Sequence, residues 1–147
     1  MASPIHIERS ALVLHPAELM FDLVNDIEAY PRFMEGCHGV AVLSRSDQEV
    51  VARLDLARGG VRQSFTTRNR LLRPESIDMQ LVEGPFSAFA GRWTFKALTD
   101  SACKVSLRLE FVFKSELVSI AGSSLFKRVA NNLVNATTRE ADRIATG

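Results

Sequence analysis

The segment from Cys103 to Phe113 alternates apolar and polar side chains more strictly than the rest of the chain. Its apolar positions are Cys103, Val105, Leu107, Leu109, Phe111 and Phe113. Because successive side chains of a β-strand point to opposite faces, the segment is predicted to be a strand with one buried face. Such a strand needs other strands beside it and a second layer over its apolar face, which is typical of an antiparallel sheet covered on one side.

Similar segments fill much of the chain before it and are separated by turn residues. Expected strands cover residues 5–14, 38–46, 49–58, 61–72, 77–81 and 88–98. The paired glycines Gly59 and Gly60, and the proline-containing segments 73–75 and 83–85, mark turns between them. The chain is therefore expected to form six to seven antiparallel strands.

Two regions have helical spacing instead. Pro16 suits the first turn of a helix that continues to about Ile27, and Pro31 either ends this helix or begins a second short one. Residues 115–145 contain no proline and carry an apolar stripe, although a kink or break at 122–124 is needed to reconcile its two halves. We predict an α+β fold, in which a curved sheet wraps a long C-terminal helix and leaves space for a ligand.

The length and composition limit the class of protein. A chain of 147 residues, 46% hydrophobic and 24% charged, is expected to form a single globular domain over residues 1–147. The formal net charge of +1 excludes a histone-like chain, and no DNA partner is expected. The absence of a signal sequence or a long apolar run favours a cytoplasmic, bacterial protein.

No catalytic or metal-binding motif stands out. The three histidines lack metal-ligand spacing, and the two cysteines, Cys37 and Cys103, form neither a CxxC motif nor a disulfide framework. Cys37 and His38 are adjacent on an expected strand, so their side chains should point to opposite faces rather than form a nucleophile–base pair. We therefore expect a protein that is not an enzyme and needs no metal or cofactor.

The inward face of the expected sheet is rich in large apolar side chains. A plain hydrophobic core explains most of them, but Gln63, Thr67 and Asn69 are polar residues on the inward face of an otherwise apolar strand. Buried polar groups need partners, which neighbouring backbone or a bound ligand can supply. Two apolar segments, 84–89 and 117–122, are expected either to pack on each other or to form an exposed lip at the mouth of a pocket or against a membrane.

Several short motifs, in their order and spacing, resemble the ubiquinone-binding branch of the START (polyketide cyclase/dehydrase-like) superfamily. They are Tyr30-Pro31-Arg32-Phe33, Gly36-Cys37, Phe65-Thr66-Thr67-Arg68-Asn69, Gly84-Pro85-Phe86, Trp93-Thr94-Phe95 and Phe111-Val112-Phe113-Lys114. The resemblance covers residues 3 to 144. One departure is Glu35, which stands where the family pattern has a proline and puts the shape of that loop in doubt.

The resemblance implies a helix-grip fold around an apolar tunnel and a non-enzymatic carrier of a polyprenylated quinone such as ubiquinone, with peripheral contact to the inner membrane. The expected ligand-binding residues are Phe33, Gln63, Phe65, Thr67, Asn69, Met79, Leu81, Phe89, Trp93, Phe95, Leu109, Phe111, Phe126, Val129, Ala130 and Leu133. It also implies two alternatives. RatA members of the group bind the large ribosomal subunit and block subunit joining, and other relatives are cyclase-type enzymes.

The near-neutral total charge hides a basic segment. Residues 53–73 contain six arginines and one acidic residue, Asp55. The arginines are Arg53, Arg58, Arg62, Arg68, Arg70 and Arg73. They are expected to form a basic surface patch, which suits RNA phosphates or anionic lipid head groups, or is simply a solvated face.

Overall fold

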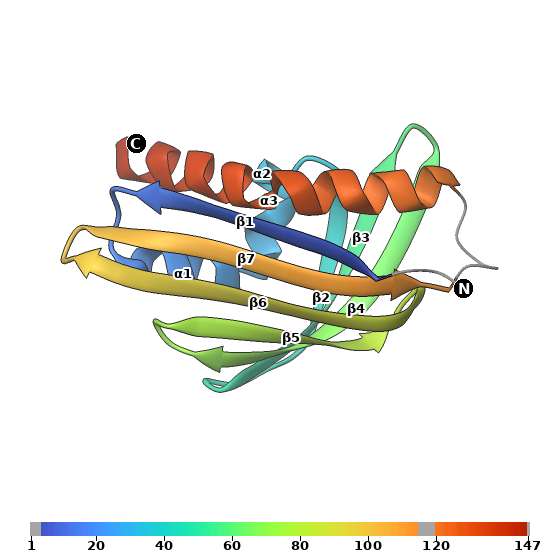
Figure 1. Ribbon diagram of the computed structural model, residues 1–147, viewed down its shortest axis with the longest axis horizontal. Helices are drawn as coiled ribbons and strands as arrows, with labels where there is room; N and C mark the ends of the chain where they lie inside the picture. Colours follow the sequence, from blue (N-terminus) through green and yellow to red (C-terminus); the bar gives the residue numbers. More distant parts are fainter. Residues whose placement is uncertain (1–3, 115–119, 147) are drawn as a thin grey trace.

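Seven strands form one antiparallel sheet in the computed structural model of the protein, which describes residues 4–114 and 120–146. The strands are β1 (Ile5–Val13), β2 (Cys37–Arg45), β3 (Glu49–Arg58), β4 (Val61–Leu72), β5 (Ser76–Glu83), β6 (Phe86–Thr99) and β7 (Ala102–Phe113). The helices are α1 (Ala17–Asn25), the 3-10 helix η1 (Ile27–Ala29), α2 (Tyr30–Phe33) and α3 (Ile120–Thr146). The predicted α+β fold and the order of its elements are confirmed (Figure 1).

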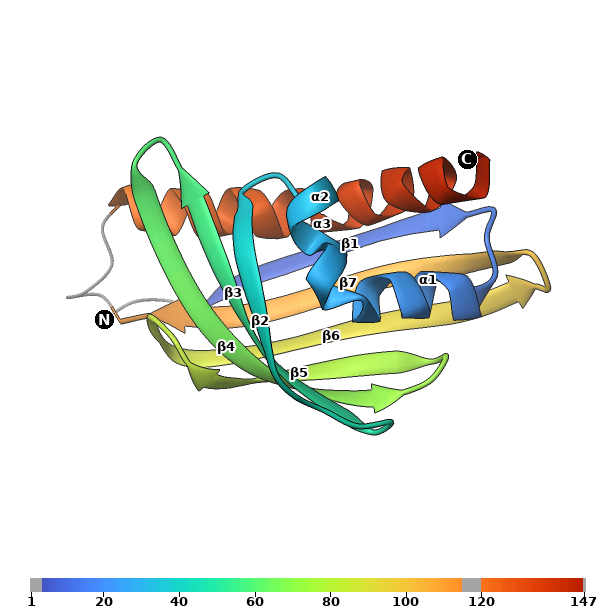
Figure 2. The same ribbon diagram turned by 180° about the vertical axis from the view of Figure 1, so that it is seen from behind.

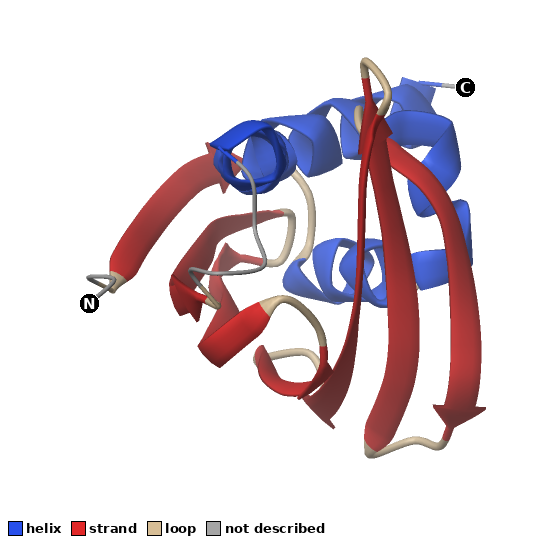
Figure 3. Ribbon diagram, turned by 90° about the vertical axis from the view of Figure 1, so that its right-hand side faces the viewer, coloured by secondary structure: helices blue, strands red, loops and turns tan. Residues whose placement is uncertain are grey.

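The sheet is strongly curved. Its strand order is β1-β7-β6-β5-β4-β3-β2, so β1 and β2 form its two edges, and α3 lies across the concave side (Figures 2 and 3). Register shifts interrupt the β2–β3, β4–β5 and β6–β7 ladders, and such bulges increase local twist and bend a strand. The curvature gives the sheet an inner face that α3 covers.

Prolines lie at the start of both α1 and α2, as predicted for Pro16 and in agreement with the second of the two alternatives for Pro31. Pro16 lies immediately before α1, and Pro31 lies in the first turn of α2, where the missing N–H of proline has no cost. A second short helix therefore follows α1. Among the helices in the described part of the chain, none combines the length and apolar character that crossing a membrane requires.

The predicted alternative of a break in the C-terminal helix at residues 122–124 is wrong. α3 is helical throughout Ile120–Thr146, including residues 122–124, while residues 115–119 of the predicted helix lie outside the described residues. A glycine inside a helix costs only about 1 kcal/mol relative to alanine. The buried side chains of Leu125, Phe126 and Val129, one turn later, offset that cost by packing on the sheet.

The turn between β5 and β6 also differs from expectation. Phe86 is only 2% exposed and packs against the rings of Phe111, Phe113 and Phe126, so segment 84–89 is not an exposed apolar lip. The aromatic side chain turns inward because the sheet curves over it and α3 closes the concave side. Segment 117–122, its expected partner in the lip, lies largely outside the described residues.

Candidate functional site

A small apolar cavity lies between the inner face of the sheet and α3. Its lining residues are Ile27, Tyr30, Met34, Ala52, Leu54, Leu56, Phe65, Thr67, Asn69, Met79, Phe89, Trp93, Leu109, Phe126, Val129, Ala130 and Leu133. They come from β3 to β7, from α3 and from the segment around η1 and α2. Strands contribute every second residue because alternate side chains share the inner face.

The structure brings eleven of the predicted ligand-binding residues together around this cavity. They are Phe65, Thr67, Asn69, Met79, Phe89, Trp93, Leu109, Phe126, Val129, Ala130 and Leu133. Strand alternation and helical spacing were therefore sufficient to predict that these side chains face the space between the sheet and α3. Their contact with a ligand remains a prediction.

Five other predicted residues do not line the cavity. Phe33 packs edge-to-face on the neighbouring tyrosine of α2, and Phe95 packs against α1. Phe111 is fully buried beneath the aromatic side chains of β6 and α3. Leu81 borders an open groove between β4 and β5, and Gln63 lies partly buried near the β3–β4 turn. Three of them, Gln63, Leu81 and Phe111, are directly opposite cavity-lining residues on the neighbouring strand, so distance along the strand does not explain why they are not in the lining.

Six lining residues were missed by the sequence reasoning. They are Ile27, Tyr30, Met34, Ala52, Leu54 and Leu56. The alternation of Val50, Ala52, Leu54 and Leu56 along β3 was a usable signal for the strand residues. No comparable pattern identifies the three residues around η1 and α2, because they reach the cavity through the turns between short helices.

Four cavity-lining side chains carry polar groups, Tyr30, Thr67, Asn69 and Trp93, and the hydroxyls of the first two already donate to other groups. The Tyr30 hydroxyl donates to the Val24 carbonyl, and burial raises the pKa of Tyr30 well above its usual value. The Thr67 hydroxyl donates to Asn69 Oδ1 at 2.8 Å. Within the described residues, no hydrogen bond uses the side-chain amide nitrogen of Asn69 or the indole nitrogen of Trp93, so these two groups are the remaining donors of the cavity lining.

The cavity is much smaller than a ligand site. Its volume is about 60 Å³, enough for a few water molecules at most. Sites for drug-sized ligands usually measure about 300–1,000 Å³. In this conformation the aromatic side chains of β4, β6, β7 and α3 fill most of the space that a tunnel needs.

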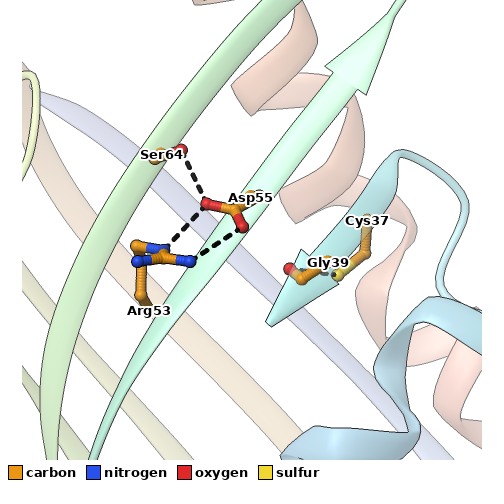
Figure 4. A network of polar contacts seen from close by, with 5 residues as sticks. All are labelled: Cys37, Gly39, Arg53, Asp55 and Ser64. Carbon is orange, nitrogen blue, oxygen red and sulfur yellow. Dashed lines mark hydrogen bonds and ion pairs between the residues drawn. The ribbon is translucent and has the colours of Figure 1, made fainter. Parts of the chain in front are cut away.

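The described surroundings of Cys37 do not activate its thiol. Burial, followed by the nearby Asp55 carboxylate, raises the pKa of the Cys37 thiol to about 11, and its sulfur lies 3.7 Å from the Gly39 carbonyl oxygen. The Ser64 hydroxyl, which donates to Asp55 at 2.7 Å, and the adjacent Arg53 guanidinium hold the pKa of Asp55 below its usual value (Figure 4). A neutral, buried thiol is a poor nucleophile.

The six predicted patch arginines are all exposed, but four of them are paired with carboxylates. The pairs are Arg53–Asp55 (3.1 Å), Arg58–Glu35 (2.6 Å), Arg68–Glu49 (2.8 Å) and Arg73–Asp22 (2.7 Å). Arg62 and Arg70, both on the outer face of β4, have no ion pair within the described residues. Counting charge along 53–73 alone overstated the patch, because three of the four partner carboxylates come from outside that range.

Glu35, at the position where a proline was expected, joins three parts of the fold. Its carboxylate lies 2.6 Å from Arg58 at the end of β3 and 3.9 Å from Arg128 on α3. The following residue, Gly36, has φ of 89°, and a Cβ there would lie 2.7 Å from a methyl group of Val129. The loop after α2 therefore approaches α3 closely, and Glu35 links it to the β3–β4 hairpin.

Residues 13–138 match the family described as "Polyketide cyclase / dehydrase and lipid transport". This match covers most of the chain, including β2 to β7 and most of α3. The chain belongs to the polyketide cyclase/dehydrase and lipid transport family. The expectation drawn from the START-like motifs is thus confirmed at the level of family and fold.

Within this family, the chain is similar to bacterial proteins named for ribosome association. The ribosome association toxin RatA of Vibrio cholerae is 46% identical over 138 residues, which is 94% of this chain and 96% of that protein. RatA of Escherichia coli K12 is 40% identical over 138 residues, 94% of this chain and 87% of that protein. The similarity therefore extends over both the cavity and the outer face of the sheet.

Solved structures of the family confirm the fold. The ZhuI aromatase/cyclase from Streptomyces sp. R1128 has a TM-score of 0.81 at 21% identity, with 96% of this chain and 95% of that chain covered. An 18 kDa protein from Caulobacter crescentus has a TM-score of 0.74 at 27% identity, with 97% and 99% covered. The first of these similarities concerns the fold alone, so the sequence relatives carry more weight for function.

Proposed function

We propose that the protein associates with the ribosome and acts there without catalysing a reaction. The observation that carries this proposal is the 46% identity to a ribosome association toxin, which extends over 94% of the chain. The resemblance noted in the sequence points to the large subunit as the binding partner. The proposal reverses the order of the two functions expected from the sequence, in which quinone carriage came first.

The outer face of β3 and β4 suits contact with ribosomal RNA. Within the described residues, Arg62 and Arg70 have no ion pair, and the other four patch arginines pair with carboxylates whose side chains are 30–65% exposed. Exposed ion pairs are worth about 0–1 kcal/mol, so an arginine can exchange its carboxylate for a phosphate at little cost. Guanidinium groups bind phosphate oxygens with two parallel hydrogen bonds.

The lining of the cavity supports a function without catalysis. Among the described residues that line it, there is no carboxylate, histidine, lysine or arginine to act as a general acid or base. Tyr30 is the one titratable lining residue, and its raised pKa keeps it neutral at physiological pH. A cyclase needs proton transfer at the reacting carbons, and the cavity offers no group suited to it.

Sedimentation with ribosomes tests the proposal. The purified protein is mixed with separated ribosomal subunits and run through sucrose gradients at low and moderate salt, with folding checked by the fluorescence of Trp93. We expect co-sedimentation with the large subunit, weakening steeply with salt because phosphate contacts release counterions. An Arg62→Glu/Arg70→Glu variant should bind more weakly and with a shallower salt dependence.

The matched control is Lys127→Glu on the exposed face of α3, a cation without an ion pair within the described residues. It changes the charge of one side chain outside the arginine patch and should leave binding unchanged. A folded protein that fails to sediment with either subunit at low salt overturns the proposal. Equal loss in the control and the arginine variant overturns the role of the β4 arginines.

A second candidate function is binding of an apolar ligand such as a polyprenylated quinone. The observation that favours it is the apolar lining of the cavity combined with the free Asn69 amide donor, which suits a quinone carbonyl. Freshly purified protein is extracted with organic solvent for mass spectrometry, and the extracted protein is titrated with ubiquinone while Trp93 fluorescence is followed. The candidate would be contradicted if the extract contained no quinone and added ubiquinone did not quench the fluorescence.

A further inference from the structure

Three leucines are unusually exposed at one end of the molecule. Leu12, Leu14 and Leu98 are 74%, 87% and 51% exposed. They lie beside Lys96 and Lys104, which have no ion pair within the described residues. We call these five residues the leucine–lysine patch.

The strand register places the patch on one surface. Lys96 of β6 is directly opposite Lys104 of β7, which in turn is opposite Leu12 of β1. Leu98 is the unpaired residue of the bulge between Ala97 and Thr99, two residues beyond Lys96, and its side chain is 51% exposed. The end of β1 and the β6–β7 turn lie side by side in both Figures 1 and 2, so the patch forms a projecting end of the sheet.

The composition of the patch is unfavourable for an isolated domain. Like charges directly opposite each other on neighbouring strands destabilise a sheet, and Lys96 and Lys104 make such a pair. The leucines contribute little to the core because most of their surface remains in water. Clusters of exposed apolar side chains on monomeric proteins mark interaction sites.

We infer that the leucine–lysine patch docks on an anionic lipid bilayer. Leucine side chains insert at the boundary between head groups and acyl chains, while adjacent lysines contact anionic head groups. RNA accounts for the lysines but leaves the leucines unexplained, because its surface is dominated by phosphates. The patch also projects at the end of the sheet rather than forming a groove, a shape that meets a flat surface.

One negative charge near the patch should weaken its attraction to an anionic surface, and this effect can be tested. Asp100 is exposed in the turn between β6 and β7, and its negative charge partly offsets the positive charges of Lys96 and Lys104. Replacing it with lysine should strengthen attraction to an anionic surface. The docking surface is distinct from the β3–β4 arginines, so it does not depend on ribosome association.

Vesicle flotation tests the inference. The full chain is mixed at low salt with phosphatidylcholine vesicles, either pure or containing an equal part of phosphatidylglycerol. We expect flotation with the anionic vesicles only. A Lys96→Glu/Lys104→Glu variant should bind at least about tenfold more weakly, a Leu14→Ser/Leu98→Ser variant about tenfold more weakly, and Asp100→Lys more strongly.

Two matched controls separate docking from general stickiness. Leu43→Ser changes a leucine that is 59% exposed on β2, the opposite edge of the sheet, and Lys127→Glu changes a cation on α3. Both should bind anionic vesicles as the unmodified chain does. All these positions are exposed, so the variants are expected to fold, and circular dichroism checks this. Absence of flotation with anionic vesicles, or equal binding by the patch variants and the controls, overturns the inference.

Discussion

Replacing Phe126 with alanine should remove the main anchor between α3 and the sheet. The Phe126 side chain is 4% exposed and its ring lies 4.8–6.3 Å from five other phenylalanine rings. These belong to Phe65, Phe86, Phe89, Phe111 and Phe113. The variant therefore tests whether this aromatic cluster holds the helix in place.

The expected loss of stability can be calculated from buried area or taken from known core substitutions, and the two values are similar. A buried phenylalanine removes about 150–250 Å² from water, and at about 25 cal/mol per Å² this is worth about 4–6 kcal/mol, an upper estimate. Substitutions of phenylalanine by alanine in protein cores cost about 3–5 kcal/mol. We expect the free energy of unfolding to fall by about 4 kcal/mol, a large part of the 5–15 kcal/mol that is typical of a domain.

Urea unfolding followed by Trp93 fluorescence is the assay. Trp93 is the single tryptophan, is 2% exposed and lines the same cavity, so its emission reports loss of the core. Ile144→Ala, at a 45% exposed position on the same helix, is the control and should change stability by less than about 0.5 kcal/mol. A loss below about 1.5 kcal/mol for the Phe126 variant, with an unchanged dependence on urea, would refute the anchoring role.

Three further predictions concern the loop after α2 and two titrating groups. Gly36→Ala should lower stability by about 1–3 kcal/mol in thermal unfolding, because φ is 89° and a Cβ would lie 2.7 Å from Val129, whereas Gly59→Ala, with open space around it, should cost less. The folded pKa of Cys37, about 11, lies above its unfolded value, so its contribution is present below about pH 9 and should be lost as pH rises towards 11; Cys37→Ala should flatten this alkaline limb of urea unfolding. The pKa of Glu140 is lowered by hydrogen bonds from the guanidinium one turn later on α3, so its contribution is present above its ordinary pKa of 4.5 and lost in more acid solution; Glu140→Gln should flatten the acid limb, and an unchanged limb would contradict this assignment.

The strand faces and the helix starts were predictable because they depend on local spacing. Alternation along β7 and β4 follows from the two-residue repeat of a strand, and Pro16 and Pro31 fix helix starts through their missing N–H. Each signal lies within a few residues of the feature that it predicts. The fold class followed from combining these local signals with the need to cover one apolar face.

The depth at which each side chain is buried and the ion pairing of the arginines were not predictable from local spacing. Phe111 and Phe89 share a face in sequence, yet only Phe89 lines the cavity, because α3 and the curvature of the sheet decide which positions remain uncovered. Phe65, Thr66 and Thr67 are consecutive in β4 and all buried, so both faces of the strand are covered there, which a pattern with one apolar face does not predict. The pairing of Arg58 with Glu35 joins residues 23 positions apart, so a charge count along one segment could not reveal it.

The free energy needed to enlarge the cavity helps to distinguish between the two proposed functions. Growth from about 60 Å³ to the 300 Å³ of a small ligand site adds about 240 Å³ of empty space. At about 24 cal/mol per Å³ this costs about 6 kcal/mol, comparable to the entire stability of many domains. A polyprenyl tail regains about 0.8 kcal/mol per buried CH₂, so about eight such groups must enter before loading breaks even. Binding of phosphates by exposed arginines on the outer surface has no comparable free-energy cost, because it does not require the core to rearrange. The proposed ribosome association therefore requires no change in the conformation described, whereas ligand carriage requires a different packing of the aromatic cluster around Phe126.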